Sequence, residues 1–169
     1  MRRDNTVDSV EKRDSQTVLF LCTGNYYRSR HAEAVFNHLA ATAGLAWRAT
    51  SRGLALERGV QNPGLIARAT LARLTVLGIP HDPYLRLPQS VTEADFRAAH
   101  LVVALKETEH RPLVTERFPS WFEQVVYWGV HDVEFASPVE ALPQIEEHVK
   151  ELIARLGSTD SGRSPEELT

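Results

Sequence analysis

The sequence contains only one cysteine, Cys22, among its 169 residues. An intrachain disulfide is therefore impossible, and a cysteine-rich zinc site is excluded. The seven histidines are scattered along the chain, and no pair has a convincing metal-ligand spacing. We therefore expect neither a metal site nor a bound cofactor.

Long hydrophobic runs and an excess of positive charge are also missing. The longest apolar runs, residues 18–22 and 101–105, have five residues each, whereas a membrane-spanning helix needs roughly 18. The formal net charge is −3, from 19 Lys and Arg against 22 Asp and Glu, and a sequence-blind nucleic-acid binder is normally basic. We therefore expect no membrane partner and no nucleic-acid partner.

The beginning of the chain does not look like a secretory signal. Arg2 and Arg3 are followed by acidic residues instead of an apolar core. We therefore expect a cytoplasmic location, where a lone thiol stays reduced. The sequence indicates no oligomeric state.

The composition is typical of a single globular domain, with 43% apolar and 24% charged residues. Residues 1–15 are polar and without period, so we expect a flexible leader there. Residues 158–169 have the same character and predict a flexible tail. The folded domain is therefore expected to span residues 16–157.

Within that domain, short apolar runs alternate with amphipathic stretches. The expected strands are residues 17–22, 47–51, 101–105 and 125–128. The expected helices are residues 29–43, 62–77, a short one after Thr92, 108–117, and a final one that begins near Ser137 and ends at Gly157. Pro143 could shift the start of the final helix by one turn. This alternation predicts an α/β fold, a three-layer α/β/α sandwich around a four-stranded parallel sheet.

The segment with the clearest chemical signal is residues 22–29 (CTGNYYRS), which joins the first strand to the first helix. Such a segment can curl into a cup whose backbone N–H groups, with the helix N-terminus, bind a tetrahedral oxyanion. The planar fork of Arg28 can hold two of its oxygens. Gly24 and Asn25 tolerate the backbone angles of a tight curl. The positive field would favour a thiolate at Cys22, and Ser29 could donate a hydrogen bond to it.

The alternative interpretation is a buried structural thiol beside a solvated Arg28. An arginine six residues after a cysteine can occur by chance. The expected strand before this segment and the amphipathic helix after it favour the anion-binding cup. We predict Cys22 and Arg28 as catalytic residues. The predicted phosphate-binding residues are Thr23, Gly24, Asn25, Tyr26, Tyr27, Arg28 and Ser29.

Residues 18–29, continuing through 32–36, resemble the signature of the low-molecular-weight protein tyrosine phosphatases. The resemblance is strong over residues 17–45 and looser but collinear to Gly157. It implies that Cys22 is the nucleophile, that Arg28 binds the phosphoryl group, that Ser29 steadies the thiolate and that Asn25 shapes the loop. The same fold also hosts thiol-dependent arsenate reductases.

Two positions depart from that family's pattern. Tyr27 stands where the family usually has a second cysteine, so oxidised Cys22 would lack a disulfide partner. Arg30 stands where the family tends to have proline. Arg30 is expected either as an exposed residue at the helix start or as an extra positive group at the pocket rim.

The resemblance also implies a general acid after the fourth strand, where the family has Asp-Pro. Asp132 holds that place, followed by Val133, and would protonate the leaving oxygen. Its alternative role is an ordinary loop aspartate, and Glu134 is the reserve candidate. His131 could tune Asp132 or face solvent, Tyr26 could line the pocket or pack on its scaffold, and Arg86 could add charge at the pocket rim.

The expected activity is that of a cysteine-dependent phosphomonoesterase with a phosphocysteine intermediate. Its expected partner is a phosphorylated protein, through phosphotyrosine, or a small aryl phosphate. One alternative is arsenate reduction, which with a single cysteine would need an external thiol. The other is a phosphate-binding module with weak catalysis or none.

Overall fold

The computed structural model describes residues 15–130 and 138–160. A parallel sheet of four strands lies at its centre, in the order β2-β1-β3-β4. The strands are β1 (Gln16–Cys22), β2 (Trp47–Gly53), β3 (Leu101–Ala104) and β4 (Val126–Tyr127). The α-helices are α1 (Arg28–Thr42), α2 (Arg68–Val76), α3 (Glu93–Ala98), α4 (Glu107–Arg117) and α5 (Pro138–Asp160), with 3-10 helices at Leu56–Gly59 and Asp82–Tyr84.

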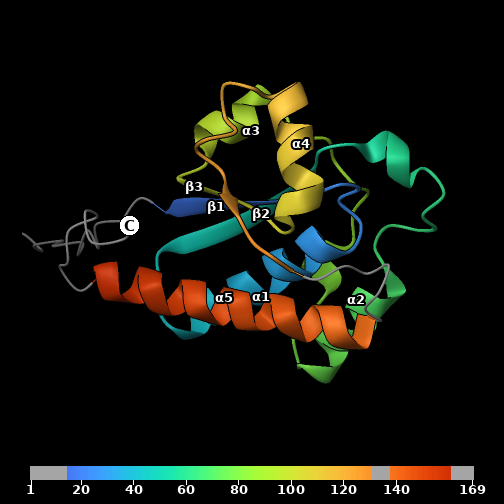
Figure 1. Cartoon of the computed structure of the whole chain (residues 1–169). Coiled ribbons are helices and arrows are strands. Elements are labelled where there is room, and N and C mark those ends of the chain that lie inside the picture. Colours follow the sequence, from blue (N-terminus) through green and yellow to red (C-terminus); the bar gives the residue numbers. More distant parts are fainter. Residues whose placement is uncertain (1–14, 131–137, 161–169) are drawn as a thin grey trace, which may run out of the picture.

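Helices cover both faces of the sheet (Figure 1). Alternate residues of β1 point to opposite faces. Val18 and Phe20 belong to the hydrophobic cluster formed with α1, α2 and α5. Leu19 and Leu21 belong to the second cluster, formed with α3 and α4. The predicted three-layer α/β/α sandwich around four parallel strands is therefore confirmed.

The register of the sheet places Cys22 at the carboxyl edge of a central strand. Cys22 lies opposite Gly53, the last residue of β2. The backbone N–H of Leu54 donates to the carbonyl of Cys22 at 2.9 Å. A β-carbon on Gly53 would lie only 2.9 Å from the Thr23 carbonyl oxygen, so glycine allows the two chains to meet here. This is the edge where parallel sheets place their ligands.

The predicted helix over residues 62–77 is wrong in its first part. The structure has α2 only from Arg68 to Val76. Gly64 adopts a positive φ of 75°, which is incompatible with a right-handed helix. Residues 62–67 instead form a connection that packs against the loop after β1.

The predicted end of the last helix at Gly157 is also wrong, since α5 continues to Asp160. Gly44 and Gly78 end their helices at positive φ, of 67° and 71°. Gly157 is not among the residues with positive φ, so nothing in its backbone ends the helix. Pro143 lies inside α5 and does not shift its start from Pro138.

The other predicted elements lie close to their expected ranges. The capping box at Thr92 is present: its hydroxyl accepts from the Asp95 N–H, and the Asp95 carboxylate accepts from the Thr92 N–H. The predicted cap at Ser137 lies outside the described residues. No helix in the described ranges is both long and apolar enough to cross a membrane.

Candidate active site

A cleft of about 490 Å³ opens at the carboxyl edge of the sheet, over the loop between β1 and α1. Cys22 lines it although its residue is only 3% exposed. The loop, the 3-10 helix region and the start of α2 all contribute to its walls. The lining residues are Cys22, Thr23, Gly24, Tyr26, Tyr27, Arg28, Arg58, Gly59, Asn62, Ala67, Arg68 and Ala69.

The sulfur of Cys22 lies 2.9 Å from the hydroxyl oxygen of Ser29, which is buried in the first turn of α1. The side-chain amide of Asn25 donates a hydrogen bond to the same hydroxyl oxygen at 3.0 Å. Because Ser29 accepts from Asn25, its own proton is available to the sulfur. The pair is arranged to stabilise a thiolate.

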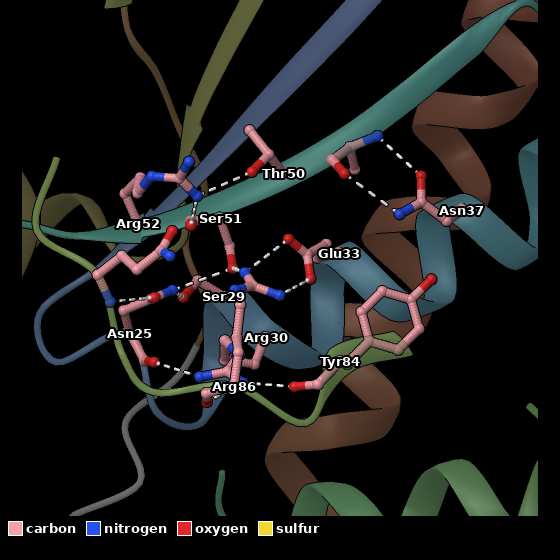
Figure 2. A network of polar contacts seen from close by, with 12 residues as sticks. Asn25, Ser29, Arg30, Glu33, Asn37, Thr50, Ser51, Arg52, Tyr84 and Arg86 are labelled. Atoms are coloured by element: carbon pink, nitrogen blue, oxygen red, sulfur yellow. Dashed lines mark hydrogen bonds and ion pairs between the residues drawn. The ribbon is translucent and has the colours of Figure 1, made fainter. Parts of the chain in front are cut away.

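Asn25 holds the loop in its curled form. It is the only non-glycine residue with positive φ, 49°, within the described ranges, a conformation that Asn tolerates better than most residues. Its amide nitrogen also donates to the Ser51 hydroxyl at 3.0 Å, and its amide oxygen accepts from the Gln89 N–H at 2.9 Å (Figure 2). The loop after β1 is thereby tied to β2 and to the segment before α3.

The backbone N–H groups of residues 23–27 donate to no protein acceptor within the described part of the chain. Buried or half-buried N–H groups normally have a partner. Five consecutive donors without one lie beside Cys22 and the start of α1. This is the condition for an oxyanion-binding loop.

Arg28 lies at the start of α1 and is held in place by Glu109 of α4. Its two terminal nitrogens donate to the two carboxylate oxygens at 2.9 and 2.8 Å. The Thr23 hydroxyl donates to the same carboxylate at 2.5 Å. The fork of Arg28 keeps further N–H groups for a bound anion.

Arg28 and Glu109 each stabilise the charged form of the other. Burial works against the charged form of Arg28, but its hydrogen bond to Glu109 and the nearby Cys22 outweigh burial and raise the arginine pKa. Burial alone would raise the pKa of Glu109, yet His110, Arg28 and Thr23 together hold it well below its usual range. Glu109 is therefore ionised at any pH at which the protein works.

His110 lies behind Glu109 and is fully buried. Its Nδ1 accepts the backbone N–H of Lys106 at 3.0 Å, so Nε2 carries the proton, and it lies 3.6 Å from Glu109. Burial lowers the pKa of His110, which favours its neutral form, although the nearby Glu109 acts in the opposite direction. Sequence reasoning missed both residues, although a carboxylate in the first turn after the third strand was a usable signal, since that turn begins at the carboxyl edge.

Both expectations for Arg30 are wrong, because its side chain is fully buried behind the loop. One terminal nitrogen donates to the carbonyls of Asn25 and Leu65 at 3.0 and 3.1 Å. The other donates to the carbonyls of Tyr84 and Arg86 at 2.5 and 2.7 Å. Figure 2 shows Arg30 beside the main-chain carbonyls of Asn25 and Tyr84. Arg30 therefore joins three loops and does not reach the pocket rim.

Arg30 keeps its charge in this setting. Burial and the nearby Arg86 lower its pKa to about 10. At neutral pH the group is still a cation, and carbonyl oxygens stabilise it.

The expectation of Arg86 as a rim charge is also wrong. Its two terminal nitrogens donate to the Glu33 carboxylate at 2.9 and 2.8 Å, and one also donates to the Ser51 hydroxyl (Figure 2). Arg86 does not line the cleft. It stabilises the network around Asn25 through Ser51.

The two loop tyrosines both line the cleft, but each is also fixed to the scaffold. Tyr26 donates from its hydroxyl to the Pro63 carbonyl at 2.7 Å. Tyr27 packs against the hydrophobic cluster of α1, α2 and α5, and burial raises its pKa despite the nearby Arg28. The wall that they form is therefore rigid.

The proposed general acid Asp132 lies outside the described residues, as do His131 and Glu134. The structure therefore gives no position for them. No group of three or more potential metal ligands occurs in residues 15–130 and 138–160. Sequence reasoning also missed three residues that line the cleft, Arg58, Asn62 and Arg68. Arg58 lies in the 3-10 helix Leu56–Gly59, Asn62 lies in the connection that was expected to be helix, and Arg68 lies at the start of α2.

A family model described as low molecular weight phosphotyrosine protein phosphatase matches residues 17–160. Three solved structures illustrate the similarity. A low molecular weight protein tyrosine phosphatase from T. tengcongensis is 25% identical with a TM-score of 0.67, over 86% of this chain and 99% of that chain. The YwlE arginine phosphatase of Bacillus subtilis is 21% identical with a TM-score of 0.67, over 87% of this chain and 97% of that chain.

The third structure is a thioredoxin-dependent arsenate reductase from Corynebacterium glutamicum. It is 20% identical with a TM-score of 0.63, over 87% of this chain and 64% of that chain. No curated protein sequence gave a significant match. The family model spans the sheet, the loop between β1 and α1 and all five α-helices, and the resemblance seen in residues 18–36 lies within it. The chain therefore belongs to the low molecular weight phosphotyrosine protein phosphatase family.

Proposed function

We propose that this protein is a cysteine-dependent phosphomonoesterase that acts on phosphotyrosine or similar aryl phosphates. The observation that carries the proposal is the loop around Cys22. A sulfur hydrogen-bonded to Ser29, a fixed Arg28 and a row of N–H groups without a described partner occur in this one loop, and its residues 22–24 and 26–28 line the cleft. That arrangement fits a phosphoryl group whose negative charge must be stabilised without a metal.

In the proposed reaction, the Cys22 sulfur attacks phosphorus, a P–S bond forms, and the P–O bond to the alcohol breaks. Arg28 and the loop N–H groups stabilise the equatorial oxygens during this transfer. Asp132 protonates the leaving oxygen. Water that Asp132 deprotonates then attacks phosphorus, breaks the P–S bond and releases inorganic phosphate.

Phosphotyrosine is favoured over phosphoarginine by the charges of the cleft. The described lining contains Arg28, Arg58 and Arg68 but no Asp or Glu. A guanidinium substrate would meet like charges from this described lining. We therefore expect aryl phosphates to be hydrolysed faster than phosphoarginine, the substrate class named for YwlE.

The test is a pH–rate profile on p-nitrophenyl phosphate around pH 5–6, for the wild type, Cys22→Ser and Asp132→Asn. We expect Cys22→Ser to abolish turnover and Asp132→Asn to lower kcat by about 100-fold or more. Rapid quenching should trap phosphate on Cys22 in the wild type. Wild-type turnover in Cys22→Ser would refute the proposal.

The alternatives give different results in the same assay set. Arsenite formation with glutathione and glutaredoxin, without comparable phosphatase activity, would indicate an arsenate reductase that uses external thiols. Tight binding of vanadate without turnover of any phosphoester would indicate a phosphate-binding module. The proposed nucleophile needs a reducing compartment, so we also propose a cytoplasmic location, which cell fractionation would test.

A further inference from the structure

Two arginines of the cleft have no role in holding the fold. Arg58 and Arg68 are exposed and line the same cleft as Cys22 and Arg28. Neither side chain has a hydrogen bond or ion-pair partner among the residues that the structure describes. The charge of Arg58 does interact with the neighbouring Glu57, but the Glu57 carboxylate forms its ion pair with Arg117. Other arginines do form such pairs, for example Arg73 with Glu146 and Arg86 with Glu33.

The position of the two side chains distinguishes them from ordinary solvated arginines. Arg155 is also exposed and makes no ion pair within the described ranges, but it lies near the end of α5, away from the cleft. Arg58 and Arg68 lie at the mouth of a site that has no acidic residue in its described lining. The chain as a whole has a net charge of −3, so the charge at the cleft is opposite in sign to that of the protein.

The segment that carries Arg58 is packed against the phosphate-binding loop. A β-carbon on Gly24 would lie 4.0 Å from the Gly59 α-carbon and 3.6 Å from the Asn62 amide nitrogen. The Asn62 N–H donates to the Gly59 carbonyl at 3.0 Å, which closes a tight turn after Arg58. The Arg58 segment therefore lies directly beside the loop at Gly24.

The segment that carries Arg68 is fixed to the same loop by hydrogen bonds. The Ala67 N–H donates to the Tyr26 carbonyl at 3.0 Å, and the Thr70 hydroxyl donates to the Tyr27 carbonyl at 3.3 Å. The Tyr26 hydroxyl donates to Pro63 from the other side. Both arginines are thus held next to the reacting group by main-chain contacts, while their side chains remain free.

We infer that Arg58 and Arg68 form an anion-binding rim that selects phosphotyrosyl peptides with acidic residues beside the phosphotyrosine. This inference rests on the proposed function. Guanidinium groups match carboxylates in shape and charge. A positively charged mouth also raises the rate at which acidic substrates reach the site. The rim acts on substrate choice, and the phosphoryl transfer stays with the loop.

The test compares two phosphotyrosyl peptides of equal length, with Glu and Asp at the flanking positions in one and Gln and Asn in the other. The proteins are the wild type, Arg58→Gln, Arg68→Gln, the double variant, and Arg155→Gln as a control with the same change of charge. We expect the wild type to favour the acidic peptide in kcat/KM by about three- to tenfold, the range for two exposed ion pairs. Turnover of p-nitrophenyl phosphate is the reference: we expect each rim substitution to change it less than it changes turnover of the acidic peptide, since the small ester has no flanking acidic residue.

The double variant should lose the preference, and each single variant should lose part of it, whereas Arg155→Gln should keep it. Raising the salt concentration to about 0.5 M should weaken the wild-type preference, because exposed charges are screened. An unchanged ratio in the double variant, or equal turnover of the two peptides by the wild type, would overturn the inference.

A binding arm separates this inference from the proposed function. Fluorescence anisotropy measures the affinity of Cys22→Ser protein, with and without the two rim substitutions, for both labelled phosphopeptides. If no phosphoester is hydrolysed but the acidic peptide binds more tightly through Arg58 and Arg68, the rim is supported and the phosphatase proposal fails. If hydrolysis occurs but neither the kinetic nor the binding measurement shows a preference for the acidic peptide, the rim is refuted and the phosphatase proposal stands. Absence of both hydrolysis and binding would refute both.

Discussion

Glu109 and Arg28 form a two-point ion pair across the site, with Nη–Oε distances of 2.9 and 2.8 Å. The two residues come from different helices, α4 and α1, that follow different strands. Arg28 has only 12% of its side chain exposed, and Glu109 has 29%. Arg28 is therefore oriented without a ligand, and in the proposed reaction this would remove an ordering cost.

Glu109→Gln should reduce catalysis without unfolding the protein. The amide keeps the shape of the carboxylate but loses its charge, so it holds Arg28 and Thr23 less firmly. We expect kcat/KM for an aryl phosphate to fall by about tenfold or more. Glu107→Gln is the matched control, because Glu107 lies one half-turn earlier in α4, is exposed and pairs only with Arg111 among the described residues. Equal activity of the two variants would refute the positioning role.

Asn25 combines a backbone role and a hydrogen-bonding role, and two substitutions separate them. Asn25→Gly keeps the positive φ but removes the hydrogen bonds to Ser29, Ser51 and Gln89. Asn25→Ala removes the same bonds and adds the strain of a positive φ, about 1 kcal/mol. We expect both variants to lose activity. The free energy of unfolding in urea should be about 1 kcal/mol lower for Asn25→Ala than for Asn25→Gly. A glycine variant with full activity would show that the hydrogen bonds are dispensable.

Arg30 should be essential for folding stability. Its replacement by Met would leave up to four buried or part-buried carbonyl groups without this donor, those of Asn25, Leu65, Tyr84 and Arg86. Unpaired buried polar groups cost about 1–3 kcal/mol each, so we expect the free energy of unfolding to fall by at least about 3 kcal/mol. Arg30→Lys keeps the charge and some of the donors, so its free energy of unfolding should fall less than that of Arg30→Met. Urea denaturation measures both, and a stable methionine variant would contradict this account.

Glu146 should make the protein less stable in acid. It accepts hydrogen bonds from Arg73 at 2.9 and 2.7 Å and lies 3.0 Å from Nε2 of His31, so it joins α5 to α2 and α1. Burial would raise its pKa, but Arg73 and His31 outweigh burial and lower the pKa to about 2. Because the folded pKa lies below the ordinary value of 4.5, the stabilisation is complete above about pH 4.5 and is lost as the pH falls towards 2.

The measurement is the free energy of unfolding of the wild type and Glu146→Gln between about pH 2 and 7. After allowance for solvent screening, we expect the pH-dependent part of the difference to be about 1–2 kcal/mol. The two curves should converge as the pH approaches 2. Glu147→Gln is the control, because Glu147 is the exposed neighbour and pairs only with Lys150 in the described structure. Parallel curves for the wild type and Glu146→Gln would refute the assignment.

The local sequence determined much of this protein. The apolar run of residues 17–22, the period of α1 and the capping box at Thr92 are short-range patterns, and each predicted its element because burial and capping act between near neighbours. Cys22, Asn25, Arg28 and Ser29 lie within eight residues, so their joint role was visible in one segment. The alternation of strands and helices then indicated the sheet and the edge at which the site lies.

The tertiary structure decided which distant residues complete the site. Glu109 lies 81 residues after Arg28, and no local pattern indicates that α4 will bring its carboxylate to that guanidinium. The burial of Arg30 depends on carbonyls from three separate loops, and the place of Arg58 and Arg68 depends on how the chain between β2 and α2 packs against the loop after β1. Such contacts depend on where long-range packing places each chain segment, whereas helix and strand patterns depend mainly on neighbours in sequence.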